Sequence, residues 1–340
     1  MELRTLGRTG VAVSPLCLGA MMFGDWGNRD HDESVRIIHA ALDSGINFVD
    51  TADVYSAGES EEIVAKALKG RRDDIILATK VHFSMGDTSN HGGNSRRWII
   101  REVEASLKRL NTDWIDLYQI HRPDSTTDIS ETLGALTDLV RQGKVRYLGC
   151  STFPAREIVE SQWVSERRNL ERFVCEQPPY SLLVRHVETE VLPVVGDYGM
   201  GAITWSPLAG GWLAGGYRLG QPQPPSTRSG RIPGRFDMSL PVNQRKLEVV
   251  EQLTLLAAEA GLTLIQLAIA FVLEHPNVTS AIIGPRTMEQ LESQLAAHDV
   301  RLSADVLDRI DEIIPPGMTI NPIDSGFIPP TLSPTARRRG

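Results

Sequence analysis

Short apolar runs alternate along the chain with longer stretches in which apolar residues recur every three or four positions. The short runs, typical of buried strands, cover residues 16–19, 48–51, 75–81, 115–121, 147–151, 173–177, 202–206 and 279–284. The stretches with helical spacing cover residues 32–45, 59–70, 96–110, 128–143, 155–168, 187–199, 244–261 with 264–275, and 287–298. Strands that are each followed by helix predict a (β/α)8 TIM barrel.

Further elements flank this repeating pattern. The segment "LRTLGRTGVAVS", residues 3–14, predicts an N-terminal β-hairpin with its turn at 7–10, and "SADVLDRIDEII", residues 303–314, predicts an extra C-terminal helix. A proline-rich tail, 315–340, is expected to pack over the outside or the rim. We therefore expect one domain over 1–340, with the barrel at about 3–314.

A doubly wound open sheet would also alternate strands with helices. Two features favour the barrel: the chain has no G-x-G-x-x-G fingerprint after its first strand, and no Pro/Gly/Ser-rich linker divides the first two hundred residues. The one irregular segment, 210–242, lies between the seventh strand and its helix. A barrel places ligand contacts in such loops.

Composition narrows the class of protein. The 340 residues are 41% hydrophobic and 23% charged, with a formal net charge of −8, which is typical of a globular chain and argues against nucleic acid or an anionic membrane as partner. No apolar run reaches membrane-span length, and we expect a cytoplasmic protein. Cys17, Cys150 and Cys175 are expected to be small core residues in a reducing compartment. No metal site is expected.

Ionisable side chains stand at the ends of three successive predicted strands. Asp50 closes the second strand, Lys80 the third and His121 the fourth, while Tyr55 lies in the loop after the second. The carboxyl ends of barrel strands open on one face, so these side chains are expected to meet there. Because a charged side chain is rarely buried without a partner, we expect Asp50 to pair with Lys80.

Such a group suits proton transfer to a carbonyl oxygen. A tyrosine with an ordinary pKa is a weak acid at neutral pH, and an ammonium beside it is expected to lower that pKa. Asp50 would hold Lys80 charged, and His121 would hydrogen-bond the substrate oxygen or the phenol. Each residue taken alone also fits a structural role, as a rim ion pair or a strand-end histidine. Asp53 has no assigned chemistry and is expected to shape the turn.

Several motifs carry a resemblance to a known family. "FVDTADVY", "ATK" and "YQIHRPD", followed by "CST", "CEQPPYS", "ITWSPLAGG" and "IIGPRTMEQLESQ", resemble the aldo-keto reductases, in particular the branch with potassium-channel β subunits and bacterial sugar reductases. The resemblance implies a barrel that binds a nicotinamide cofactor without a Rossmann fold and transfers a hydride to an aldehyde or ketone. It also implies Tyr55 as general acid, Lys80 and Asp50 as its tuning pair, and His121 as the orienting donor.

The resemblance further implies the contacts to the cofactor, NADPH or NADP+. Ser151, Thr152 and Gln177 match positions that hydrogen-bond the nicotinamide carboxamide, and Trp205 matches the aromatic on which the ring stacks. Without the resemblance, Trp205 could equally be a barrel-core residue. The remaining matches are Gly19 and Met21 near the nicotinamide ribose, Ser206, Leu208 and Gly210 at the pyrophosphate, and Gly284, Arg286, Gln290 and Gln294 at the adenosine end. Asp50 is also among the expected cofactor contacts.

Arg286 predicts the choice of cofactor. It stands at the start of a predicted helix, where backbone amides favour a phosphate, and its guanidinium suits a 2′-phosphate, so we expect NADPH to be preferred over NADH. In isolation the same arginine would be an ordinary surface residue. Two positions depart from the branch: Gly216 stands where many relatives have a lysine for the pyrophosphate, with Arg228 expected to compensate, and Gln294 replaces an asparagine.

The expected partner is a small-molecule carbonyl substrate. The loops after the first and third strands carry apolar residues that could form a wall beside the reacting groups. The predicted substrate contacts are Tyr55, His121, Met22, Phe23, Trp26 and Phe83.

Two other functions fit parts of the pattern. A redox-sensing accessory subunit, like the potassium-channel β subunits, would keep the same four residues and hold NADPH with slow turnover. No added regulatory segment is expected ahead of the barrel, which favours an enzyme. A barrel aldolase or transaldolase would use Lys80 to form a Schiff base, but this leaves Tyr55, Gln177 and Trp205 without roles.

Overall fold

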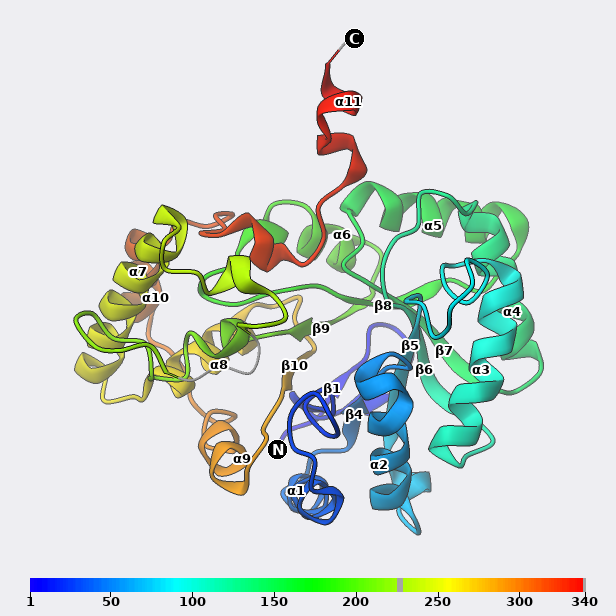
Figure 1. Cartoon of the computed structure of the whole chain (residues 1–340), viewed down its shortest axis with the longest axis horizontal. Helices are drawn as coiled ribbons and strands as arrows, with labels where there is room; N and C mark the ends of the chain where they lie inside the picture. The colour runs from blue at the N-terminus through cyan, green and yellow to red at the C-terminus, as the bar shows by residue number, and fades with distance from the viewer. Residues whose placement is uncertain (225–228, 339–340) are drawn as a thin grey trace.

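Eight parallel strands close into a barrel, and Figure 1 shows helices arranged around it. The computed structural model of the chain describes residues 1–224 and 229–338. The ring closes where β10 pairs with both β3 and β9. The strands are β3 (Leu16–Gly19), β4 (Phe48–Asp50), β5 (Ile76–Val81), β6 (Ile115–Ile120), β7 (Val145–Ser151), β8 (Phe173–Gln177), β9 (Gly201–Trp205) and β10 (Ser280–Ile283). These bounds confirm the predicted (β/α)8 barrel.

The helices outside the barrel follow the predicted spacing, and α10 is the extra C-terminal helix. They are α1 (His31–Asp43), α2 (Glu59–Leu68), α3 (Arg96–Leu110), α4 (Ile129–Arg141), α5 (Ala155–Arg168), α6 (Val191–Asp197), α7 (Pro241–Glu259), α8 (Leu264–Glu274), α9 (Met288–Leu295) and α10 (Ala304–Ile313). The helix predicted over 187–199 is shorter than expected. A separate 3-10 turn, η3 (His186–Glu188), precedes α6, and Glu190 between them has a non-helical backbone.

The barrel interior has an apolar layer in the middle of the strands and a polar layer at their carboxyl ends. The strand residues of the apolar layer are Cys17, Phe48, Ala78, Leu117, Cys175 and Ile203, all fully buried. Side chains alternate along a strand, so the residue two positions further on also points inward. Those next residues are Gly19, Asp50, Lys80, Gln119, Gln177 and Trp205. The period of two thus brings the predicted site residues to the carboxyl end of the barrel.

The predicted N-terminal hairpin closes the opposite end. β1 (Arg4–Thr5) and β2 (Ala12–Val13) pair antiparallel, and Leu6 and Val13 complete the apolar layer. Gly7 has a φ of 55° and lies so close to the chain before β9 that a Cβ there would stand 2.8 Å from the Gly199 carbonyl oxygen. Only glycine fits this contact.

The three cysteines are free and buried, as predicted. Cys17 and Cys175 lie in the interior apolar layer, and Cys150 lies in the core between strands and helices. Among the described residues, no single helix has both the length and the hydropathy to cross a membrane, whereas α7 and α8 pass that test together as a pair bent by 92°.

The chain after α10 returns across the rim of the barrel. We call residues 314–326 the C-terminal segment. The Arg185 guanidinium donates to the Ile314 carbonyl at 2.5 Å, and the Arg185 amide donates to the Met318 carbonyl at 2.8 Å. Further on, Asp324 pairs with Lys246 of α7 at 3.0 Å, and both side chains are buried. Residues after the segment, including α11 (Pro334–Arg337), project from the body in Figure 1.

The Asp324–Lys246 pair is predicted to hold the C-terminal segment in place. Replacing Asp324 with Asn leaves the Lys246 ammonium buried without a counter-charge, so we expect the free energy of unfolding to fall by about 3 kcal/mol in urea titrations. The matched control is Asp308→Asn on the exposed face of α10, expected to change it by less than about 0.5 kcal/mol. Equal effects of the two substitutions would rule out this role for the pair.

Candidate functional site

The centre of the site is a buried ion pair between adjacent strands. The Lys80 ammonium donates to Asp50 Oδ1 at 2.5 Å and to the Thr51 carbonyl at 2.8 Å. Asp50 Oδ2 accepts from the side-chain amides of Gln119, at 3.1 Å, and Gln177, at 2.9 Å. Both Asp50 oxygens are therefore satisfied by protein groups, as a buried carboxylate requires.

The ion pair keeps Lys80 charged. Burial alone lowers the pKa of this ammonium, but the charges and hydrogen bonds of Asp50 and Tyr55 outweigh burial, and the pKa ends above its ordinary value. Only a neutral amine attacks a carbonyl carbon, so this environment disfavours the Schiff-base role considered for Lys80.

Tyr55 reaches the ion pair from a strained turn. Its hydroxyl accepts a hydrogen bond from Lys80 Nζ at 3.3 Å, which leaves the phenolic proton free to be donated. Tyr55 begins the 3-10 turn η1 (Tyr55–Gly58), in which Ser56, Ala57 and Gly58 have φ values of 49°, 55° and 96°. The chain must reverse through these left-handed conformations for the phenol to point back over β4.

The pKa of Tyr55 differs from the sequence-based expectation. Burial raises the pKa of the phenol, and the Lys80 ammonium only partly offsets that effect, so the net direction is upward rather than downward. Tyr55 therefore stays protonated at neutral pH. In this environment Lys80 limits the rise in the pKa of Tyr55 and does not lower it below the ordinary value.

His121 directly follows β6 and faces Tyr55. The two ring centroids are 5.7 Å apart in an edge-on arrangement, and the centroid of the Phe83 ring lies 4.9 Å from that of His121. Burial, with the charges of Lys80 and Arg122, lowers the pKa of His121 well below its ordinary value, so the ring is neutral. Its Nδ1 is buried without a hydrogen-bond partner among the described residues.

A second charge network, between α2, β5 and α3, supports the turn that carries Tyr55. Glu61 of α2 accepts from the hydroxyl of Thr79, the neighbour of Lys80, at 2.6 Å, and from Arg109 Nε at 2.6 Å. The Arg109 side chain fills the space beside Gly58, where a Cβ would stand 2.6 Å from Arg109 Cδ. Asp53 is fully buried, and its Oδ1 accepts from the Val54 amide at 2.6 Å, in keeping with the turn-shaping role predicted for it.

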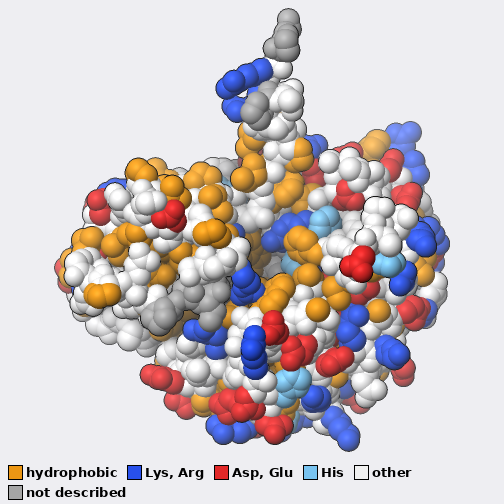
Figure 2. All heavy atoms as spheres, viewed as in Figure 1, with side chains coloured by type: hydrophobic (Ala, Val, Ile, Leu, Met, Phe, Trp, Pro, Cys, Tyr) orange, Lys and Arg blue, Asp and Glu red, His pale blue; other side chains and the backbone are white. Residues whose placement is uncertain are grey.

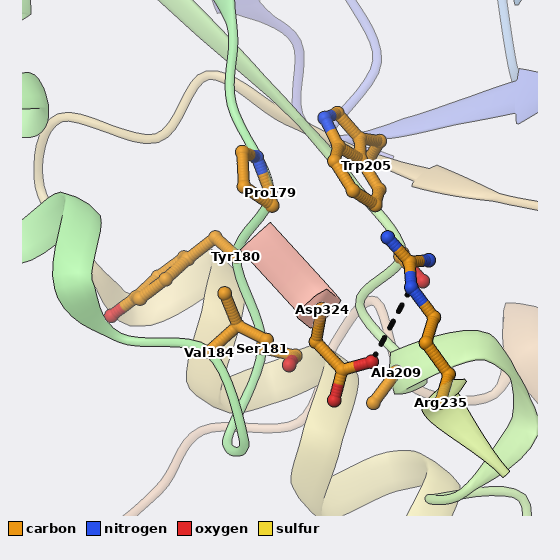
Figure 3. A pocket seen from close by; sticks show the side chains of 9 residues that line it. Pro179, Tyr180, Ser181, Val184, Trp205, Ala209, Arg235 and Asp324 are labelled. Carbon is orange, nitrogen blue, oxygen red and sulfur yellow. Dashed lines mark ion pairs between the residues drawn. The ribbon is translucent and has the colours of Figure 1, made fainter. Parts of the chain in front are cut away.

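The residues expected to hold the nicotinamide gather beside this centre. Ser151 Oγ donates to the Gln177 carbonyl at 2.9 Å, and the Thr152 amide donates to the same carbonyl at 3.1 Å. The Trp205 indole donates to Thr152 Oγ1 at 3.3 Å. Trp205 is partly exposed at the end of β9, so it is not a barrel-core residue, and Figure 3 shows its ring beside a small pocket.

The loop after β9 contains the predicted pyrophosphate contacts. Ser206 has a φ of 62°, and its hydroxyl accepts from the Gly210 amide at 2.9 Å, so that amide is occupied within the loop. Leu208 is partly buried against the core. Gly216 is followed by a stretch that includes Arg228, and Arg228 lies outside the described residues.

The predicted adenosine end lies at β10 and α9. A Cβ placed on Gly284 would meet no atom within 4 Å, so the space there is open. The Arg286 amide donates to Gln290 Oε1 at 2.9 Å just before α9 begins. Gln294 is buried, and its Oε1 has no hydrogen-bond partner among the described residues. An unsatisfied buried acceptor of this kind fits a ligand with N–H donors.

Only some of the residues of the predicted apolar wall lie beside the reacting groups at the carboxyl end of the barrel. The ring centroids of Trp26 and Tyr55 are 5.9 Å apart, and Phe83 is exposed beside His121. Met22 is buried, but its sulfur lies 3.9 Å from the guanidinium of Arg231. Phe23 is fully buried in the core between strands and helices, so its ring does not line the wall. Gly19 ends β3 and Met21 follows it in the same loop.

Sequence reasoning missed residues whose role depends on distant parts of the chain. Gln119 bonds Asp50, Arg122 stands beside Trp205, and Asp324 and Arg235 line the pocket in Figure 3. For Gln119 a signal was available, because it lies two residues before His121, in register with Lys80 on the neighbouring strand. For the others, no local pattern marks them.

The comparisons with known proteins agree with this geometry. A profile described as "Aldo/keto reductase family" matches residues 15–315. The chain belongs to the aldo/keto reductase family. Within the described residues, no three His, Cys, Asp or Glu side chains are grouped to hold a metal ion.

Curated relatives of this aldo/keto reductase cover nearly its whole length. The "Uncharacterized oxidoreductase YrpG" of Bacillus subtilis is 42% identical over 327 residues, 93% of this chain and 96% of the relative. The "Probable voltage-gated potassium channel subunit beta" of Arabidopsis thaliana is 38% identical over 321 residues, which cover 92% of this chain and 97% of the relative. A "Putative voltage-gated potassium channel subunit beta" of Schizosaccharomyces pombe is 36% identical over 322 residues, 92% of each. These relatives match the branch inferred from the motifs.

A buried acid fixes the loop after β7. The Phe153 amide donates to Glu176 Oε1 at 3.1 Å, and Oε2 has no partner among the described residues. Burial raises the pKa of Glu176 to about 8, which its hydrogen bonds only partly counter. Glu176 is therefore protonated at neutral pH, next to Thr152 and Gln177.

This pKa predicts a pH dependence of stability. The folded protein holds the Glu176 proton at pH values where the unfolded chain has released it, so the free energy of unfolding falls as pH rises from about 5 to about 8. The Glu176→Gln side chain is neutral at every pH and lacks this contribution. The melting temperature of this variant should therefore fall less than that of the wild type as pH rises across the same range. Glu160→Gln on exposed α5 is the control. Parallel profiles for all three proteins would contradict the assignment.

Proposed function

We propose that this chain reduces an aldehyde or ketone to an alcohol with NADPH, and that Tyr55 donates the proton. The observation that carries the proposal is the Lys80 ammonium, held charged by Asp50 and 3.3 Å from the Tyr55 hydroxyl. All of these groups lie at the carboxyl end of the barrel, beside a neutral His121.

The residues present fit a nicotinamide dinucleotide. Trp205 offers a partly exposed ring, Gly284 leaves open space, and Gln294 carries a buried acceptor without a partner among the described residues. When bound, the nicotinamide supplies the hydride that adds to the carbonyl carbon. Ser151, Thr152 and Gln177 would hold its carboxamide, and Arg286 the 2′-phosphate.

The chain's own residues supply the proton and the positioning. The Tyr55 hydroxyl donates its proton to the carbonyl oxygen as that oxygen gains negative charge, and the phenolate left behind is stabilised by the Lys80 ammonium. Asp50 keeps this ammonium charged while it is buried. The neutral imidazole of His121 can donate a hydrogen bond to the same oxygen and so orient the substrate.

The names of two relatives favour a second candidate, an accessory subunit that binds NADPH and turns over slowly. Such a subunit would keep the same four residues, so geometry does not separate the two functions. Steady-state NADPH oxidation with a panel of aldehydes and ketones decides: rapid turnover of any of them supports the enzyme, and tight NADPH binding with only slow turnover supports the accessory subunit.

Tyr55→Phe is predicted to lower kcat for carbonyl reduction by at least about a hundredfold, because it removes the proton donor. Binding of NADPH, followed by quenching of tryptophan fluorescence, should persist. Tyr198→Phe is the matched control, since Tyr198 lies before β9, at the opposite end of the barrel, and should leave kcat unchanged. A near wild-type kcat in the Tyr55→Phe variant contradicts the assignment of Tyr55 as acid.

Arg286→Ala is predicted to weaken the preference for NADPH. If Arg286 binds the 2′-phosphate, kcat/KM with NADPH should fall about tenfold or more while kcat/KM with NADH changes little, because NADH lacks that phosphate. Arg301→Ala, an exposed arginine after α9, serves as the control. Equal losses with both cofactors contradict 2′-phosphate recognition by Arg286.

A further inference from the structure

Basic side chains crowd the substrate side of the site. Two guanidiniums flank the Trp205 ring: that of Arg122 lies 5.9 Å from the ring centroid and that of Arg235 lies 5.8 Å from it. Arg122 directly follows His121 and also lies 5.8 Å from the centroid of Phe83. Figure 3 shows the Arg235 side chain directed toward Trp205, and Figure 2 shows Lys and Arg side chains on both sides of the central hollow.

A third arginine lies at the edge of the same region. Arg231 is exposed, and its guanidinium stands 4.8 Å from the Trp26 ring centroid. Trp26 in turn contacts Tyr55. The three arginines therefore lie around the reacting groups, whereas the predicted adenosine end lies at Gly284 and α9.

Few acidic groups balance these charges. Asp324 lies 3.5 Å from Arg235 but 3.0 Å from the buried Lys246, so one carboxylate serves two cations. In residues 1–224 and 229–338, no carboxylate lies within ion-pairing distance of Arg122 or Arg231. Arg122 Nη1 donates to the carbonyl of its neighbour His121, at 2.6 Å.

This arrangement is electrostatically unfavourable without an anion. Burial lowers the pKa of Arg122, Tyr55 and Glu176 oppose this only in part, and the like charge of Arg235 adds to the lowering. A guanidinium stays protonated even so, and a charge that is partly buried without a counter-ion costs free energy. The guanidinium fork binds carboxylates and phosphates through two parallel hydrogen bonds, so an anion would relieve the repulsion.

We propose that Arg122, Arg235 and Arg231 form a subsite for an anionic group on the substrate. The substrate class is then an aldehyde or ketone that also carries a carboxylate or a phosphate. This inference rests on the proposed carbonyl reduction and adds to it the charge of the substrate. Arg122 and Arg235 bind the anion beside Trp205, and Arg231 attracts it at the entrance.

Matched substrates test the charge preference. 4-Carboxybenzaldehyde and methyl 4-formylbenzoate share one ring and one aldehyde and differ in charge, and glyceraldehyde 3-phosphate with glyceraldehyde forms the phosphate pair. We expect kcat/KM to favour the anionic member of at least one pair by about tenfold or more, and the preferred pair identifies the anion. Equal kcat/KM within both pairs overturns the proposal.

Substitutions locate the subsite. Arg122→Met and Arg231→Met keep the apolar stem and remove the charge, so the ratio of kcat/KM between anionic and neutral substrate should fall, mainly through KM. Arg167→Met, which removes a guanidinium 5.1 Å from the exposed Trp163 on α5, should leave the ratio unchanged. If Arg122→Met and Arg231→Met weaken NADPH binding with the ratio intact, these arginines hold cofactor phosphates and the proposal is wrong.

A binding measurement separates this inference from the proposed function. Terephthalate carries the anion but no reducible carbonyl, so it and inorganic phosphate can be titrated against the melting temperature of the protein. A rise in the melting temperature of the wild type that is absent in the Arg122→Met variant supports the subsite even if no carbonyl is reduced. No rise with either anion, in a protein that does reduce aldehydes, overturns the subsite and leaves the proposed function intact.

Discussion

A full positive charge and a full negative charge lie inside this barrel, and the rest of the site follows from the need to stabilise them. Moving Lys80 and Asp50 out of water costs several kcal/mol for each, which their mutual attraction repays only when the remaining lone pairs and protons are also satisfied. The Gln119 and Gln177 amides and the Thr51 carbonyl meet that need. The interior is therefore polar in the layer of the ion pair and apolar in the layer below it.

Backbone strain is concentrated at the same face. Seven non-glycine residues of the described chain have positive φ, and two of them are the helix-ending Asn111 and Asn169. The other five are Ser56, Ala57, Thr152, Ser206 and Ala209, in the loops after β4, β7 and β9. Such conformations cost about 1–3 kcal/mol each and persist only where surrounding contacts impose them. The loops that meet the predicted cofactor and the phenol are thus held by the scaffold.

Much of the fold could be predicted from the sequence because its signals are local. Asp50 ends β4 and Lys80 lies one residue before the end of β5. In both places an ionisable residue stands at the close of an apolar run, and a barrel brings such strand ends together. The contacts of Arg235 and Asp324 join residues far apart in the chain, and nothing near either residue indicates its partner. The pKa of Tyr55 was predicted in the wrong direction because burial, which pattern alone does not measure, outweighs the effect of Lys80.

The burial of the cysteines limits one route of chemical damage to the protein. Burial, reinforced by nearby carboxylates, raises the pKa of Cys17, Cys150 and Cys175 well above the ordinary thiol value. Only a thiolate attacks an electrophile readily, and it must be reached first. Electrophiles that modify exposed thiolates therefore find none of the three cysteines of this chain accessible. The three thiols can react only when the fold opens locally around them.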